Sequence, residues 1–411
     1  MEDELGQGAR RTAVIAVLTV AMALGILPMV AVGVLAPFLI DDFEISRASL
    51  GVLVSIVAGV SALLSPVAGT IVDRVGDRWS VIAVVAAGTA ALALMAAAPT
   101  FLAMCFALAL AGICRAGANP STNRLITARV PRGRRGWITA VKQTGETAAI
   151  VLAAAALPAV AIAWGWRAAL LCFGAVAGVA ALAGVRAIQG SHRGVHPGKR
   201  GEGEPLRRSM RSLYGFNLVM GAGTGAVTAY LPLYAHEKGG LSVAAAGAVM
   251  IAAGAVAGVA RLALTRASEI RWGFPDSMSA FALVAAVACV VLLLAPSLGP
   301  AAFWVGAALW GVGGLGFGAI AMLAVMSEAG EANVGRASGL TVLWFSLGYT
   351  VAPPLFGLSV DLSDAYAPAF LLITALYLVA IGIMVTTRSW YLPIAPHAAP
   401  TGEDPARGAP A

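Results

Sequence analysis

The sequence predicts an all-α integral membrane protein with twelve transmembrane helices in two bundles of six. Three observations support this fold class: 59% of the 411 residues are hydrophobic and only 11% are charged, the apolar residues form twelve long runs, and one polar stretch divides these runs into six and six. Soluble domains carry about 25% charged residues, so this chain lacks the polar residues to cover a water-exposed surface. The net charge of +7 does not indicate a nucleic-acid partner, because the basic residues lie in short loops between apolar runs.

Each predicted span is an apolar run close to the length that a helix needs to cross a lipid bilayer. A hydrocarbon core of about 30 Å requires about 20 apolar residues, and a helix is favoured because it satisfies its own backbone hydrogen bonds. The first run has no small-residue cleavage site, so it is a span and not a signal peptide. The first six spans are 12–37, 48–72, 79–98, 101–123, 136–163 and 168–185. The second six are 213–234, 243–264, 277–294, 301–326, 337–360 and 368–385.

The distribution of basic residues predicts which ends of the spans lie in the cytoplasm. Only Arg47, Arg167 and Lys238 lie in the loops that follow odd-numbered spans. Six acids lie in the same loops: Asp41, Asp42, Glu44, Glu237, Asp361 and Asp364. Because loops rich in Lys and Arg stay in the cytoplasm, we expect both termini to be cytoplasmic and the protein to lie in the cytoplasmic (inner) membrane.

The chain divides into five parts. We expect a cytoplasmic N-terminal tail (1–11), a six-helix bundle (12–185), a cytoplasmic linker rich in Gly, Arg, Lys and His (186–212), a second six-helix bundle (213–385) and a disordered cytoplasmic tail rich in Pro, Ala and Gly (386–411). Two such halves with a substrate between them at mid-depth are a common arrangement for alternating access.

The loop between the second and third spans reads Gly69-Thr-Ile-Val-Asp73-Arg74-Val-Gly76-Asp77-Arg78. It resembles the signature of the major facilitator superfamily, G-x-x-x-D-R/K-x-G-R/K-R/K. Gly69 should permit a close helix contact and Gly76 a tight turn, whereas Asp77 departs from the signature and is expected to weaken the local charge network.

The resemblance implies the major facilitator fold and a role for this loop. In the family, Asp73 would face the positive N-terminal end of the eleventh span, near Gly335 and Arg336, and latch the cytoplasmic gate in the outward-open state. Together, Gly69, Asp73, Arg74, Gly76 and Arg78 form this predicted gating motif. The alternative is an ordinary charged loop that only sets topology.

Two further segments narrow the resemblance. The residues at 119–126 and 142–146 are similar to those of a bacterial branch that includes cyanate-transporter-like permeases. The fifth span lacks the G-P-x-x-G-G run that is typical of proton-driven drug antiporters, which disfavours drug efflux.

Four charged residues lie inside the predicted spans: Arg115, Lys142, Glu146 and Arg261. A charge at mid-membrane costs about 2.5–3.5 kcal/mol, so each needs a cavity or a partner. Lys142 and Glu146 lie one turn apart and either neutralise each other or act on substrate, with Glu146 taking up a proton and Lys142 binding an anion. Arg115 is expected to contact an anion, with a partner on another helix as the alternative. Arg261 either binds ligand or extends to the cytoplasmic surface.

Three bases against one acid favour a substrate with negative charge. Asn119, Asn217, Tyr230 and Trp344 are further candidate substrate contacts, although helix packing or an interfacial aromatic belt also explains such residues. The four cysteines lie in apolar runs without a CxxC pair, so no metal or other cofactor is expected. We expect a functional monomer.

These features predict a secondary active transporter of a small organic anion, most simply a proton-coupled symporter or permease, and not an enzyme. The alternative is a multidrug or metabolite exporter, a proton antiporter of the same fold in which Glu146 binds cations. A membrane enzyme would need a metal cluster or an HExxH, GxSxG or Walker motif, which the sequence lacks. A receptor or assembly factor would need a larger domain outside the membrane.

Overall fold

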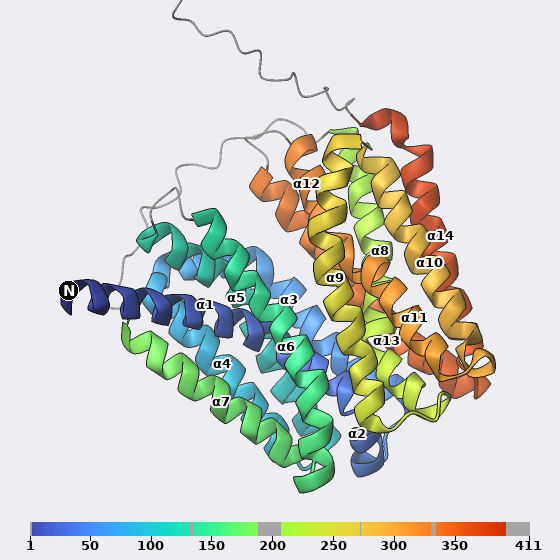
Figure 1. Ribbon diagram of the computed structural model, residues 1–411, viewed down its shortest axis with the longest axis horizontal. Coiled ribbons are helices and arrows are strands. Elements are labelled where there is room, and N and C mark those ends of the chain that lie inside the picture. The colour runs from blue at the N-terminus through green and yellow to red at the C-terminus, as the bar shows by residue number, and fades with distance from the viewer. Residues whose placement is uncertain (1, 131–134, 188–206, 272, 330–333, 392–411) are drawn as a thin grey trace, which may run out of the picture.

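The computed structural model describes residues 2–130, 135–187, 207–271, 273–329 and 334–391, and these ranges form helices and no strands (Figure 1). The helices of the first half are α1 (Glu2–Val34), α2 (Ala36–Phe43), α3 (Arg47–Val75), α4 (Asp77–Ala97), α5 (Phe101–Arg129), α6 (Arg135–Trp164) and α7 (Trp166–Ala187). The helices of the second half are α8 (Arg208–Glu237), α9 (Val243–Arg271), α10 (Phe274–Leu298), α11 (Pro300–Trp310), α12 (Gly318–Ala329), α13 (Val334–Ser363) and α14 (Ala367–Thr386).

The twelve predicted spans are confirmed in the part of the chain that the structure describes. Eleven helical segments are long and apolar enough to cross a membrane, and the shorter apolar helix α7 supplies the remaining span. The tenth span is made of α11, a π-helical turn (Gly311–Leu315) and α12, which follow one another along one rod. The short helix α2 is not a span.

The helices pack as two groups that follow the chain order (Figure 1). In the first half, α1 packs against α6 and α7, and α4 packs against α5 and α7. In the second half, α10 packs against α11 and α14, and α8 packs against α13 and α14. The halves meet mainly where α3 contacts α13 and where α6 contacts α9.

The bundle has two ends, which we name by the linker. The linker face is the end at which α7 finishes and α8 begins, and the far face is the opposite end, which carries α2. Helix α3 therefore runs from the far face to the linker face, and α13 runs the opposite way.

Contacts between the halves lie toward the far face. Ser55, in the outer part of α3, donates a hydrogen bond of 2.5 Å to the Thr350 carbonyl of α13. On α9, a side chain added at Gly247 would collide with the Ala154 carbonyl of α6. Toward the linker face, the ribbons of the two halves diverge (Figure 1). The halves are therefore closed against each other at the far face.

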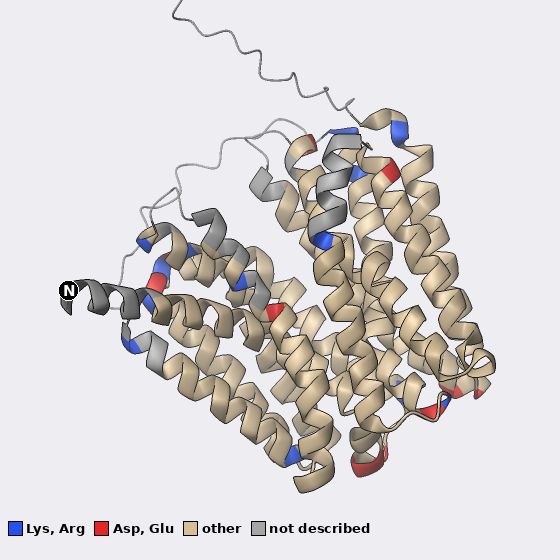
Figure 2. Ribbon diagram, viewed as in Figure 1, with Lys and Arg blue, Asp and Glu red and all other residues tan. Residues whose placement is uncertain are grey.

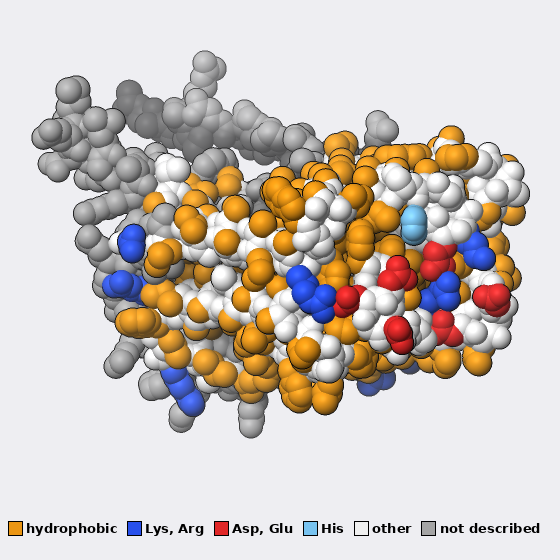
Figure 3. Space-filling model, turned by 90° about the horizontal axis from the view of Figure 1, so that it is seen from below, with side chains coloured by type: hydrophobic (Ala, Val, Ile, Leu, Met, Phe, Trp, Pro, Cys, Tyr) orange, Lys and Arg blue, Asp and Glu red, His pale blue; other side chains and the backbone are white. Residues whose placement is uncertain are grey.

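Acidic side chains gather at the far face, as Figures 2 and 3 show, with a few basic ones among them. Arg167 forms an ion pair of 2.8 Å with Asp42 there, which joins the start of α7 to α2. Described Lys and Arg residues are more frequent toward the linker face (Figure 2). This segregation matches the charge pattern read from the sequence.

Helix boundaries differ from the predicted spans where polar residues continue a helix beyond the bilayer core. The first span was expected to end at Pro37, but α1 ends at Val34 and Pro37 lies in the first turn of α2, where its missing N–H leaves no bond unmade. Helix α8 begins at Arg208, inside the predicted linker. The predicted tail begins with ordered chain, because a 3₁₀ turn (Arg388–Trp390) follows α14.

Candidate functional site

A cavity of about 250 Å³ lies between the two halves near mid-depth. Its wall is mostly apolar and comes from both halves, as in many small-molecule sites. The first half contributes Ile26, Met29, Val30, Arg115, Glu146, Thr147 and Ile150. The second half contributes Asn217, Thr224, Thr228, Met250, Arg261, Gly314, Leu315, Phe317, Gly318, Ala321, Met322, Thr341, Val342, Phe345 and Tyr349. Three of the four charged residues predicted inside the spans therefore meet at one cavity.

Glu146 is the one acid among the described lining residues. It lies on α6 and is half-buried, and it forms no hydrogen bond or ion pair with any residue that the structure describes. Its carboxylate lines the same cavity as Arg261 of the opposite half. The predicted Lys142–Glu146 ion pair is not formed.

Lys142 turns away from the cavity and binds α5. Its ammonium donates to Asn123 Oδ1 at 2.6 Å, Thr122 Oγ1 at 2.9 Å and Asn119 Oδ1 at 3.3 Å, and its side chain is fully buried. The three oxygens come from positions three and four apart on one face of α5. Lys142 thus joins α6 to α5, and neither Lys142 nor Asn119 lines the cavity.

Arg115 reaches the cavity from α5. Its one hydrogen bond to a described residue is long, 3.4 Å from Nη1 to the Gly25 carbonyl of α1. Tyr349 of the opposite half lines the same cavity. Because a guanidinium has five N–H donors, most of them remain for a ligand.

Arg261 reaches the cavity from α9 and binds the broken tenth span. Its Nε and Nη2 donate to the Leu315 carbonyl at 3.2 and 3.0 Å, at the end of the π-helical turn. Thr224 Oγ1 donates to the neighbouring Gly314 carbonyl at 2.8 Å. These bonds satisfy carbonyls at a helix break, and π-helical turns are frequent at functional sites. Arg261 therefore faces the cavity and does not extend to the linker face.

Of the remaining predicted substrate contacts, one lines the cavity and two do not. Asn217 lines the cavity, although its amide also donates to the Leu213 carbonyl of its own helix at 2.8 Å. Tyr230 is buried near the far face, and Trp344 is partly exposed outside the cavity. Thr147 and Thr228 line the cavity but were not singled out from the sequence. For Thr147 the available signal in the sequence was its position beside Glu146; for Thr228 we find no such signal.

The predicted gating motif lies at the end of α3. Gly76 has φ of 94°, which confirms the tight turn into α4. A Cβ at Gly69 would meet none of the described atoms within 4 Å, so the expected close helix contact is not found among the described residues. Arg74 and Arg78 flank the turn, and the surroundings of Gly335 and the side chain of Arg336 lie outside what the structure describes. Asp73 forms an ion pair of 2.8 Å with Arg124 of its own half.

Asp77 strengthens the local charge network, contrary to expectation. Its carboxylate is fully buried and accepts a hydrogen bond of 2.7 Å from Arg129 Nε at the end of α5. The other carboxylate oxygen accepts the Arg78 backbone N–H at 2.8 Å, at the positive N-terminus of α4. The acid that departs from the family signature thus ties α4 to α5.

Comparison with known proteins identifies the family. The family model described as Major Facilitator Superfamily matches residues 12–353. The chain belongs to the major facilitator superfamily. As a superfamily member it is a multi-pass membrane transporter and not an enzyme. The comparison with curated proteins finds no match.

Solved structures of transporters share this major facilitator fold. A bacterial homologue of the human lysosomal transporter Spinster, in an inward-facing and occupied conformation, has a TM-score of 0.74 at 19% identity over 93% of this chain and 97% of that chain. Its inward-facing, unoccupied form has a TM-score of 0.72 at 18% identity, over 93% and 96% of the two chains. A variant of the nucleoside transporter NupG has a TM-score of 0.75 at 13% identity over 91% and 98%. At these identities the likeness shows the fold alone.

Proposed function

We propose that this superfamily member is a secondary active transporter that carries a small organic anion together with protons by alternating access. The observation that carries the proposal is the charge of the cavity wall, where Arg115 and Arg261 face one carboxylate, Glu146. Each arginine comes from a different half, so an anion held by both would join the halves across the cavity.

Donor geometry supports an anion more than a cation. Arg115 has one long hydrogen bond, and Arg261 is held by a single neutral carbonyl. A carboxylate would offer either guanidinium an ion pair with two parallel hydrogen bonds, which a neutral carbonyl cannot provide. The apolar wall supports an organic anion with a small hydrocarbon part.

Proton coupling follows from the same charges. With Glu146 ionised, the two positive charges and one negative charge of the wall leave one net positive charge. Protonation of Glu146 leaves two, so a bound proton favours a bound anion, and linkage requires the converse. The proton and the anion would therefore cross together.

Charge segregation also supports the proposed topology. Acids at the far face and bases near the linker face support a linker face that lies in the cytoplasm, with the protein in the cytoplasmic membrane. The conformation described is then closed to the outside, and the Spinster homologue of similar fold is likewise in an inward-facing conformation. We propose that the monomer is the functional unit, because its cavity is complete within one chain.

Transport by the purified protein in proteoliposomes tests the proposal. Labelled monocarboxylates, dicarboxylates, cyanate and amino acids are offered with and without a proton gradient. We expect one class of carboxylate to accumulate, and to accumulate more when the solution from which it is taken up is acidic. Failure of every anion to move, with rapid movement of lipophilic cations, would refute the proposal.

The alternative is a multidrug or metabolite exporter that exchanges cations for protons. The apolar part of the cavity wall, which includes Met29, Met250 and Phe345, supports it. In that mechanism Glu146 would bind the cation directly, and the two arginines would oppose it. Resistance of cells to lipophilic cations, compared with accumulation of organic anions, separates the two functions.

A further inference from the structure

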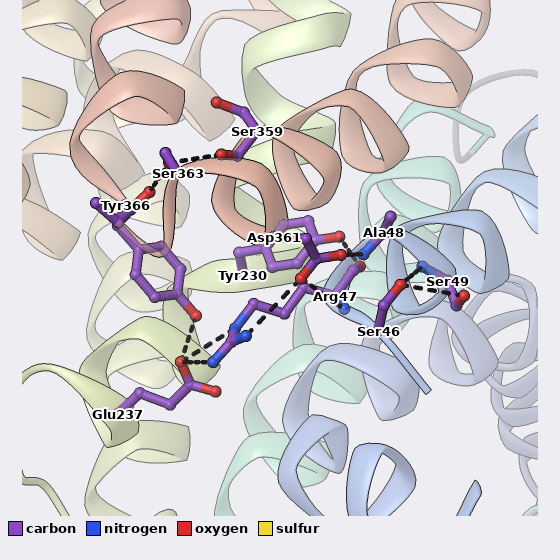
Figure 4. Close-up of polar contacts among 11 residues, drawn as sticks. Ser46, Arg47, Ala48, Ser49, Tyr230, Glu237, Ser359, Asp361, Ser363 and Tyr366 are labelled. Carbon is purple, nitrogen blue, oxygen red and sulfur yellow. Dashed lines mark hydrogen bonds and ion pairs between the residues drawn. The ribbon is translucent and has the colours of Figure 1, made fainter. Parts of the chain in front are cut away.

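Helix α3 begins at the far face against the end of α13, where a carboxylate of one half meets the backbone of the other (Figure 4). Asp361 accepts the backbone N–H of Ala48 at 2.8 Å and that of Arg47 at 3.2 Å. These N–H groups belong to the first turn of α3 and have no partner within their own helix. The negative charge of Asp361 thus lies at the positive end of the helix dipole.

The side chain of Arg47 extends the same junction to α8. Its Nη2 and Nε donate to Glu237 Oε2 at 2.8 and 3.2 Å, and Nη1 lies 3.8 Å from Asp361. Tyr366 donates to the same Glu237 oxygen at 2.9 Å, and Tyr230 donates to the Arg47 carbonyl at 2.5 Å. One residue of the first half is therefore held by two helices of the second half, α8 and α13, and Tyr366, just before α14, supports Glu237 (Figure 4).

Backbone packing beneath the charges is tight. A Cβ at Gly51 of α3 would lie 2.5 Å from the Pro353 carbonyl of α13, and a Cβ at Gly357 would collide with Tyr230 and with the Arg47 carbonyl. Glycine at these positions lets α3 and α13 touch directly. The junction thus combines charge, hydrogen bonds and contact, all across the boundary between the halves.

The opposite ends of the same two helices have a similar order of residues without the contact. Asp73 lies near the C-terminal end of α3 at the linker face, where α13 begins at Val334. Each helix therefore carries an acid near its C-terminal end, at the face where its antiparallel partner begins. Only the far-face pair joins the two halves here, because Asp73 is bound to Arg124 of its own half.

We infer that Asp361 and Arg47 are positioning residues of the transport cycle, which hold the far face closed while the cavity is open toward the linker face. Asp361 is the counterpart of Asp73, and the two acids act in alternation on the two ends of the α3–α13 pair. When the far face opens, Asp361 leaves the N-terminus of α3, and Asp73 becomes free to engage the N-terminus of α13.

Distances between labels on the full-length protein in lipid nanodiscs test this inference, after replacement of the two cysteines that are not buried. Spin labels at Asp41→Cys and Ser297→Cys report the far face, and labels at Ala128→Cys and Ser327→Cys report the linker face; all four positions are exposed. In Asp361→Asn we expect the ratio of far-face-closed to far-face-open molecules to fall about fivefold, with linker-face distances shortening in step.

Matched variants separate this role from general stabilisation. Asp364→Asn removes an exposed acid three residues away that has no ion pair or hydrogen bond among the described residues, and it should leave both distance distributions unchanged. If Asp361→Asn does not fold, Tyr366→Phe must shift the far-face distances in the same direction by a smaller amount. Unchanged distances in Asp361→Asn, or in Tyr366→Phe where that variant takes its place, would overturn the inference. The experiment uses no substrate, so its outcome is independent of whether the proposed anion is correct.

Discussion

The substitution Glu146→Gln should tighten anion binding while removing its pH dependence. Glutamine keeps the shape of the side chain and copies the charge of the protonated acid. The variant therefore holds the cavity permanently in the state with two net positive charges. We expect it to exchange anions between the two sides but not to accumulate them with a proton gradient.

The size of the effect follows from the width of the cavity. A sphere of 250 Å³ is about 8 Å across, which sets the distance between Glu146 and an anion held on the opposite wall. Two unit charges at about 8 Å repel by about 2 kcal/mol at an effective dielectric constant of about 20, and by about 1 kcal/mol when the cavity is wetter. Removal of this repulsion tightens binding about five- to thirtyfold at a pH where Glu146 is ionised.

Isothermal titration of the purified protein with the carboxylate that is transported best, over a range of pH, measures this effect. The wild type should bind more weakly as the pH rises, and Glu146→Gln should bind equally at every pH. Asp41→Asn, which removes an exposed acid far from the cavity, serves as the control. A pH dependence that persists unchanged in Glu146→Gln would refute the reasoning.

Three further substitutions test separate parts of the structure. Arg115→Gln should weaken carboxylate binding about tenfold, because a charge-assisted hydrogen bond is lost. The control Arg186→Gln, at an exposed position at the end of α7, should leave binding unchanged. Equal losses of affinity in the two variants, measured in a competition assay, would contradict the role of Arg115. Lys142→Met should destabilise the protein by about 1–2 kcal/mol, seen as a lower unfolding temperature in detergent, with substrate Kd within about twofold of wild type. A higher substrate Kd in Lys142→Met at an unchanged unfolding temperature would instead assign Lys142 to the substrate site. Gly357→Ala should separate α3 from α13 and lengthen the far-face label distances, and wild-type distances would refute the close packing.

The helices were predictable from the sequence because a membrane span is a local property. A run of apolar residues must form its backbone hydrogen bonds within itself, so length and hydropathy suffice to find it. The π-helical turn at Gly311–Leu315 was not predicted, because a glycine-rich apolar run is compatible with a continuous helix as well as with a broken one. Its need for Thr224 and Arg261 as partners depends on how the second half packs.

Intramembrane charges were found by the same local reasoning, and three of the four meet at the cavity. Their partners were not predictable from neighbours in sequence. Lys142 was paired with Glu146 by helical spacing, yet it binds oxygens of α5 that lie about twenty residues earlier in the chain. The spacing of Asn119, Thr122 and Asn123 on one face of α5 was the available signal.

Contacts across the whole chain were beyond sequence reasoning. Arg47 and Asp361 were noted only as loop charges that set topology, and 314 residues separate them. Their pairing depends on the antiparallel packing of α3 against α13, which is a property of the assembled halves. Asp77 shows the same limit, because its departure from the family signature is matched by Arg129 on another helix.

The number of protons taken up with each bound anion tests the central claim most directly. Titration of the wild type in two buffers of different ionisation enthalpy gives this number. For a five- to thirtyfold coupling we predict a maximal uptake of about 0.4–0.7 proton per anion, in the pH range over which anion binding weakens, and no uptake in Glu146→Gln. Anion binding without proton uptake at any pH, or equal uptake by the variant, would contradict the account.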